Sequence, residues 1–128
     1  MDTQADPTLE DFIREAKKEN WTDIDLWMTE AIATSCLGWA MKDGLVDDND
    51  GVRDLAATFL DESDAPLGQN DQAVLADKMA VDDYHIVRYR LAVALYKRGN
   101  RNPKVVEMME RALEDSDIGP LALSHFKG

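Results

Sequence analysis

Two stretches of the sequence, 47–60 and 82–95, carry the same residue pattern at an offset of 35 positions. They share six identical residues, which in the first stretch are Asp47, Asp48, Val52, Arg53, Ala57 and Leu60. A third and more degenerate copy begins at Asp115, 33 residues after Asp82. Repeats of roughly 20–50 residues are typical of solenoids, in which each helical hairpin buries its apolar face against its neighbours. The repeat therefore predicts a stack of helical hairpins.

Helix signals recur along the whole chain, whereas no stretch has the sustained alternation of a β-strand. Asp6 followed by Pro7 predicts the start of a first helix, because an N-cap and a proline at the first helical position favour one. The apolar period from Thr22 to Gly44 predicts one long second helix. Capping residues, glycines and apolar periods predict further helices at about 50–60, 71–79, 83–98 and 103–114, and a short apolar piece at 118–126.

The segment 82–115 resembles the repeat unit of HEAT-like proteins, in particular the short bacterial and archaeal HEAT-like repeats. Val87 and Arg88, small residues such as Ala92, and Gly99 after the first helix carry the resemblance. It implies an all-α fold, a right-handed α-solenoid of about three stacked antiparallel hairpins. The single domain 1–128 would then comprise an N-terminal helical hairpin (1–46), HEAT-like repeats (47–80 and 82–115) and a C-terminal capping segment (116–128).

In HEAT-like proteins, an aspartate and an arginine at the start of each unit form a ladder of charge pairs between units. The resemblance implies this structural role for Asp48, Arg53, Asp83 and Arg88. Arg53 and Arg88 also lie one turn into their helices beside apolar neighbours. Their stems can cover the core while the guanidinium reaches a neighbouring loop. We therefore expect both arginines to be structural.

The net charge is unevenly distributed along the chain. The 128 residues include 14 Lys and Arg and 26 Asp and Glu, which gives a net charge of −12. Residues 1–80 have a net charge of −13, whereas residues 81–128 have +1. Acidity of this kind disfavours nucleic acid and anionic membranes as general partners. The basic segment 88–104 leaves local phosphate or nucleic-acid binding open as an alternative function.

Cysteine content and the N-terminal residues bear on the compartment. Cys36 is the only cysteine, so an internal disulfide and a cysteine-based zinc site are excluded. The first twenty residues are rich in acids and lack the apolar run of a secretory signal. No apolar run approaches the roughly 20 residues that a membrane span needs. We therefore expect a cytoplasmic protein that does not associate with membranes.

No set of residues in the sequence matches a catalytic or metal-binding pattern. His85 and His125 do not have the spacing of metal ligands. Cys36 lies in an apolar helical stretch, where a small packing residue is expected. The acidic stretch 47–51 does not fit a calcium loop, because two positions that require carboxylates lack them. We therefore expect no enzymatic activity, no metal and no cofactor.

These observations predict a small HEAT-like interaction module that binds a protein or peptide. We expect the partner to have a basic surface, since residues 1–80 are acidic. Solenoid surfaces use large side chains to hold partners, and tryptophans could have this role here. The alternative is that the tryptophans pack in the core. Self-association through the apolar C-terminal piece is a third hypothesis, so we expect a monomer or a homodimer. The candidate partner-binding residues are Trp27, Trp39, Arg90, Lys97, Arg98 and Arg101.

Overall fold

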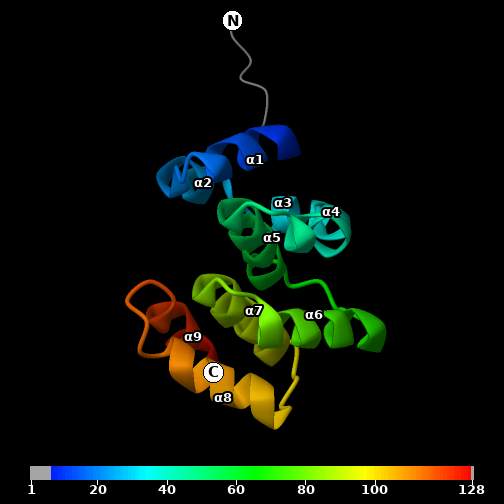
Figure 1. Ribbon diagram of the computed structural model, residues 1–128, viewed down its shortest axis with the longest axis vertical. Coiled ribbons are helices and arrows are strands. Elements are labelled where there is room, and N and C mark those ends of the chain that lie inside the picture. Colours follow the sequence, from blue (N-terminus) through cyan, green and yellow to red (C-terminus); the bar gives the residue numbers. More distant parts are fainter. Residues whose placement is uncertain (1–6, 128) are drawn as a thin grey trace, which may run out of the picture.

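The computed structural model describes residues 7–127, and every regular element in that range is helical (Figure 1). This confirms the prediction of an all-α fold. The described elements are α1 (Leu9–Lys17), α2 (Trp21–Trp27), α3 (Glu30–Ser35), α4 (Leu37–Lys42), a 3-10 turn η1 (Gly44–Val46), α5 (Asp50–Glu62), α6 (Gln69–Val81), α7 (His85–Lys97), α8 (Pro103–Ala112) and α9 (Gly119–Lys127).

The helices follow one another along the longest axis of the molecule, from α1 and α2 at one end to α8 and α9 at the other (Figure 1). The two central helices are α5 and α7. Helix α5 packs against α1, α3, α4 and α7, while α7 also packs against α6, α8 and α9. Leu55 and Phe59 of α5 and Leu91 and Leu95 of α7 are fully buried. Each such side chain stabilises the fold by roughly 1.5–3 kcal/mol, so the core is centred on this helix pair.

The prediction of one long helix from Thr22 to Gly44 is wrong, because three short helices replace it. Helix α2 ends where Met28 takes an extended conformation (φ −70°, ψ 128°). Thr29 then caps α3, with its hydroxyl accepting a hydrogen bond from a first-turn N–H at 3.1 Å. A second break occurs at Cys36, between α3 and α4. The apolar period survives these breaks because α3 and α4 both pack against α5.

The first helix also begins later than the sequence pattern predicts. Thr8 is the N-cap of α1, and its hydroxyl accepts a hydrogen bond from the N–H of Asp11 at 3.2 Å. The Asp11 carboxylate accepts in return from the N–H of Thr8 at 2.8 Å. This reciprocal capping box satisfies two backbone donors at the helix start. Asp6, the predicted cap, lies outside the described residues. By contrast, Asn102 and Pro103 open α8 as predicted.

The sequence repeat has a counterpart in the local structure. The carboxylates of Asp47, Asp82 and Asp115 each accept a hydrogen bond from the backbone N–H two residues later, at 2.8, 2.9 and 2.8 Å. Arg53 and Arg88 each donate to the backbone carbonyl of the aspartate six residues earlier, at 3.0 and 2.6 Å. The same turn therefore precedes α5, α7 and α9, and the first two turns are closed by the same arginine contact.

Arg53 joins the first repeat to the second. Its Nε donates to the buried carboxylate of Asp82 at 3.0 Å, and its Nη2 donates to Asp83 at 2.9 Å. Asp48 takes part through its backbone carbonyl, which accepts from Arg53 at 3.1 Å. Arg88 bonds within its own unit, to the carbonyl of Asp82. Within residues 7–127, the charge pairs between the 47–80 and 82–115 units at these positions therefore come from Arg53 alone.

Candidate binding site

Arg90 lies in the interface between α5 and α7. Its Nε donates to Asp54 at 2.6 Å and its Nη1 donates to Asp61 at 3.0 Å. Both carboxylates belong to α5 and are buried, with 4% and 2% of their residue surfaces exposed. A guanidinium between two buried carboxylates cross-links the helices with charge-assisted hydrogen bonds. The structure therefore places this predicted partner-binding residue in a contact that holds the fold together.

The other basic residues singled out near the end of α7 are also engaged within the chain. Lys97 pairs with Asp64 at 2.9 Å, and Arg98 donates to two backbone carbonyls of the segment after α5, at 2.9 and 2.8 Å. The guanidinium of Arg101 stacks on the ring of Tyr96, 3.6 Å from its centroid. The contacts of Lys97 and Arg98 hold the loop between α5 and α6 against α7, whereas Arg101 contacts α7 itself. These contacts leave few free donors for an anionic partner.

Trp27 and Trp39, the two tryptophans predicted to contact a partner, are half-buried and pack against core aromatic rings. Trp27 meets Phe12 edge to face, with centroids 5.5 Å apart, and Trp39 meets Phe59 at 6.0 Å. Edge-to-face pairs of this kind add stability beyond their buried area. Their placement favours the packing role over contact with a partner.

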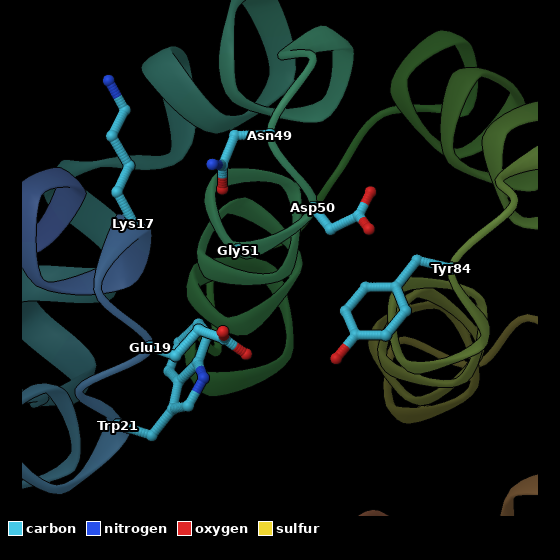
Figure 2. Close-up of a pocket in the computed structure, with 7 residues that line it drawn as sticks. All are labelled: Lys17, Glu19, Trp21, Asn49, Asp50, Gly51 and Tyr84. Carbon is cyan, nitrogen blue, oxygen red and sulfur yellow. The ribbon is translucent and has the colours of Figure 1, made fainter.

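The third tryptophan, Trp21, lies at the edge of a hollow that the chain leaves open (Figure 2). This first hollow has a volume of about 370 Å³ and is lined by Lys17, Glu19, Trp21, Asn49, Asp50, Gly51 and Tyr84. A second hollow of about 440 Å³ shares Glu19, Trp21 and Tyr84 and is also lined by Asp25, Asp54, Ile86, Arg90, Asp117 and Ile118. Because they share three residues, we treat the two hollows as one surface and call it the acidic cleft.

The end of α1 positions one wall of the acidic cleft. The N–H groups of Glu19 and Asn20 donate to the carbonyls of Ala16 and Glu15 at 3.0 and 2.9 Å, the pairing of a Schellman helix ending. Glu19 takes the left-handed conformation that this ending requires, with φ 59°. Glycine usually occupies such a position, because a side chain is strained there. Asn20 then caps α2, which begins with Trp21.

The start of α5 forms the opposite wall of the acidic cleft, because α5 approaches α1 closely at Gly51. A Cβ atom added at Gly51 would clash with the carbonyl oxygen of Ala16, so a larger residue would push the two helices apart. The side chain of Asn49 caps α5 by accepting from the N–H of Val52 at 3.1 Å. Asn49 and Asp50 consequently lie across the first hollow from Glu19 (Figure 2).

Negative charge dominates the acidic cleft, which five acidic and two basic residues line. Glu19, Asp25 and Asp117 are exposed, whereas Trp21 and Tyr84 are half-buried. None of the ion pairs within residues 7–127 includes Glu19, Asp25 or Asp117. The cleft therefore combines open carboxylates with partly buried aromatic rings.

The phenol of Tyr84 responds to this negative charge. Burial raises the pKa of Tyr84, and the carboxylates of Asp54, Glu19 and Asp50 raise it further, while Arg90 acts in the opposite direction. A raised pKa means that the surroundings disfavour a negative group at this hydroxyl. A positively charged group placed beside Tyr84 would be stabilised by the same carboxylates.

Asp61 in the α5–α7 interface has the most strongly perturbed carboxyl group of those described here. Its Oδ2 accepts from Arg90, whereas its buried Oδ1 has no hydrogen-bond partner among the described residues. Burial raises the pKa of Asp61 to about 7, although the charge of Arg90 acts to lower it. Burial also raises the pKa of Asp54 against the effect of Arg90. Burial therefore favours the protonated form of both carboxyl groups, and Arg90 favours the charged form.

The two histidines and Cys36, the other residues considered for chemistry, do not line the acidic cleft. Among residues 7–127, no group of three or more His, Cys, Asp or Glu side chains is arranged to hold a metal ion. His85 packs edge to face against Tyr89, and its Nε2 lies 3.6 Å from Asp115. Burial lowers the pKa of His125 and raises the pKa of the Cys36 thiol.

Comparisons with known protein families, curated proteins and solved structures find no match to this chain. None of the helices in the described part of the chain is long and apolar enough to cross a bilayer.

Trp21 and Tyr84 are not among the partner-binding residues that the sequence pattern predicts. Trp21 lies between Asn20 and Asp23, and Tyr84 directly follows two aspartates. At such a polar helix start, a large aromatic residue lies outside the apolar stripe that packs into the core. This position is a sequence signal for a role at the surface. That signal could have identified both residues, but it does not show that segments more than 60 residues apart in sequence face one another.

Proposed function

We propose that the protein is a small, non-catalytic HEAT-like interaction module that binds a basic segment of a protein partner in the acidic cleft. The observation that carries this proposal is the combination of open carboxylates and half-buried aromatic rings around one hollow surface. Carboxylates attract and orient a basic partner, while aromatic rings supply contact area that excludes water.

We also propose that the helices form a right-handed α-solenoid of stacked hairpins. The repeated aspartate turn before α5 and α7, with its arginine contact, supports the HEAT-like resemblance. The packing of α5 against α7, each followed by a second helix, supports a stacked arrangement. In such a stack, the turns at the helix starts lie along one edge, where a partner segment could contact several units.

The alternative function, phosphate or nucleic-acid binding through 88–104, has weaker support. Arg90, Lys97 and Arg98 already bond to acidic side chains or backbone carbonyls of the chain. Binding phosphate with these side chains would leave buried acceptors without partners, which is unfavourable. Arg101 and Lys104 are exposed, but two cations give only a small phosphate-binding surface.

Calorimetric titration with the basic peptide acetyl-GKGRGKGRG-amide tests the proposed function. We expect binding that weakens between 50 and 300 mM salt, because exposed charges contribute and salt screens them. A variant with Glu19→Gln, Asp25→Asn and Asp117→Asn should bind about tenfold more weakly, which corresponds to about 1.4 kcal/mol.

The matched control carries Glu62→Gln, Asp71→Asn and Asp77→Asn, which remove the same charge from exposed positions on α5 and α6. Because these residues lie outside the acidic cleft, we expect at most a small loss of affinity. An equal loss in both variants would show that only net charge matters, which contradicts the proposal. An oligonucleotide that binds more tightly than the peptide would favour the alternative function.

A further inference from the structure

Two kinds of chemical group surround the first hollow of the acidic cleft. Tyr84 reaches across the hollow toward Glu19 and Trp21, and Asp50 lies beside the gap between them (Figure 2). These four side chains come from three separate parts of the chain, namely the α1–α2 turn with the first residue of α2, the first turn of α5 and the N-cap of α7. Aromatic faces and carboxylate oxygens are therefore presented to the same space.

The basic side chains that the structure describes do not fill this space. Among them, Lys17 alone lines the first hollow, and its side chain points away from Tyr84 (Figure 2). Asp50 accepts one hydrogen bond from Arg53 through its Oδ1. A carboxylate can accept about four hydrogen bonds, so Asp50 keeps acceptor capacity. Asp50 and Glu19 are thus available to a cation that enters from a partner.

A planar cation suits these surroundings better than a compact one. A guanidinium stacks its faces on aromatic rings and donates from its edge to carboxylates, whereas an ammonium is a strongly hydrated point charge. The chain uses the two kinds of contact separately elsewhere, because Arg101 stacks on Tyr96 at 3.6 Å and Arg53 is shared among three carboxylates. Such a group would stack on Trp21, with Tyr84 on the other side of the hollow, while donating to Glu19 and Asp50.

We infer that the hollow between Trp21 and Tyr84 binds the guanidinium group of an arginine side chain of the partner. This inference rests on the proposed function, since it names the group that the basic segment places in the cleft. It assigns Trp21 and Tyr84 to stacking and Glu19 and Asp50 to hydrogen bonding. The site therefore selects arginine over lysine, rather than responding to positive charge alone.

Three peptides of equal length test this inference by calorimetry with the full chain. They are acetyl-GRGRGRG-amide, the counterpart with lysine in place of arginine, and the counterpart with citrulline, which keeps the shape of arginine but has no charge. We expect the arginine peptide to bind about fivefold more tightly than the lysine peptide. The citrulline peptide should bind at least about tenfold more weakly than the arginine peptide, because the carboxylates then lose a cation.

Two variants of Trp21 separate stacking from a loss of structure. Trp21→Leu should remove the preference for arginine over lysine, whereas Trp21→Phe should keep it, because phenylalanine retains an aromatic face. Thermal unfolding of both variants serves as the folding check. Because the half-buried Trp21 packs against the core, Glu19→Gln provides a second test at an exposed position, where we expect weaker arginine binding without a loss of stability.

The outcomes distinguish this inference from the proposed function. If the arginine and lysine peptides bind equally well, or if Trp21→Leu retains the preference, the inference is wrong although the basic-segment proposal stands. Equal binding of the citrulline peptide would likewise overturn the inference. If none of the three peptides binds and the mixed peptide acetyl-GKGRGKGRG-amide does not bind either, both proposals fail.

Discussion

Two groups of charged side chains border α5 and differ in how they are used. In the α5–α7 interface, Arg90 bonds to Asp54 and Asp61, so these charges are buried and paired. In the acidic cleft, the exposed carboxylates of Glu19 and Asp25 take part in none of the ion pairs of residues 7–127. The sign and number of charges in a segment therefore do not predict which of them a partner can reach, because burial and pairing decide this.

Removal of Arg90 gives the largest expected effect and tests whether the interface is structural. Arg90→Ala leaves the carboxylates of Asp54 and Asp61 buried without their cation. We expect the free energy of unfolding to fall by about 3–5 kcal/mol, as when one partner of a buried ion pair is deleted. Denaturant unfolding followed by circular dichroism measures this change.

Arg111→Ala is the matched control for that measurement. Arg111 forms an exposed ion pair with Glu107 on α8, at 3.1 Å. Exposed helix pairs contribute about 0.3–0.5 kcal/mol, so the control should be nearly neutral. A loss below about 1 kcal/mol for Arg90→Ala would mean that the interface does not depend on this ion pair.

The pH dependence of stability gives an intermediate effect that is specific to the interface. Because the pKa of Asp61 in the folded protein is raised to about 7 from 3.8, the folded state binds more protons than the unfolded chain between these values. Stability from this group therefore falls as the pH rises. Between pH 5 and 8, the loss should amount to at most about 3 kcal/mol.

The variant Asp61→Asn isolates this contribution, since asparagine does not titrate. We expect its free energy of unfolding to increase relative to the unmodified chain as the pH rises from 5 to 8. His125 has a lowered pKa and acts in the opposite direction, but it is present in both proteins and cancels in the difference. Parallel pH profiles of the two proteins would contradict the burial of an ionisable Asp61.

Substitution of Glu19 at the end of α1 gives the smallest expected change in the free energy of unfolding. It measures how much stability the left-handed glutamate of the acidic cleft costs. Glu19→Gly should raise the free energy of unfolding by about 0.5–1 kcal/mol, because relief of the left-handed conformation exceeds the added entropy of the unfolded chain. The same change removes a carboxylate from the cleft, so binding of the basic peptide should weaken. Thermal unfolding and calorimetric titration measure the two effects.

Gly99 provides the comparison position for this prediction. It occupies the same place in the ending of α7, with φ 91° and hydrogen bonds of 3.0 and 3.1 Å in the same pattern. Gly99→Ala should lower stability by about 1 kcal/mol through backbone strain alone, because no atom lies near the added Cβ. If Glu19→Gly lowers stability instead, the glutamate does more for the fold than its strained conformation indicates.

The sequence predicts the all-α class and most helices, because apolar periods, caps and the 35-residue repeat are local signals. Asn102 with Pro103 and Gly99 mark helix boundaries that the structure contains. The prediction of one long second helix is wrong for a physical reason. The apolar period continues through Met28 and Thr29, but the threonine hydroxyl caps a new helix there.

The candidate site could not be predicted to the same extent. Arg90 is a surface candidate in the sequence, yet it faces two buried carboxylates that lie 29 and 36 positions earlier in the chain. Pairing of this kind depends on tertiary packing, which local patterns do not contain. The juxtaposition of Trp21 with Tyr84 has the same origin, since it depends on the close contact of α1 with α5 at Gly51 and on the packing of α5 against α7.

Nuclear magnetic resonance mapping shows where on the chain a basic segment binds. The ¹⁵N-labelled chain would be titrated with acetyl-GRGRGRG-amide at low salt while backbone amide and tryptophan indole shifts are followed. We predict that the largest shifts fall on the Trp21 indole and on amides at 17–25, 49–54, 84–86 and 117–118. Shifts that are absent there, or that are largest along α6 at 69–81, would contradict binding of the basic segment in the acidic cleft.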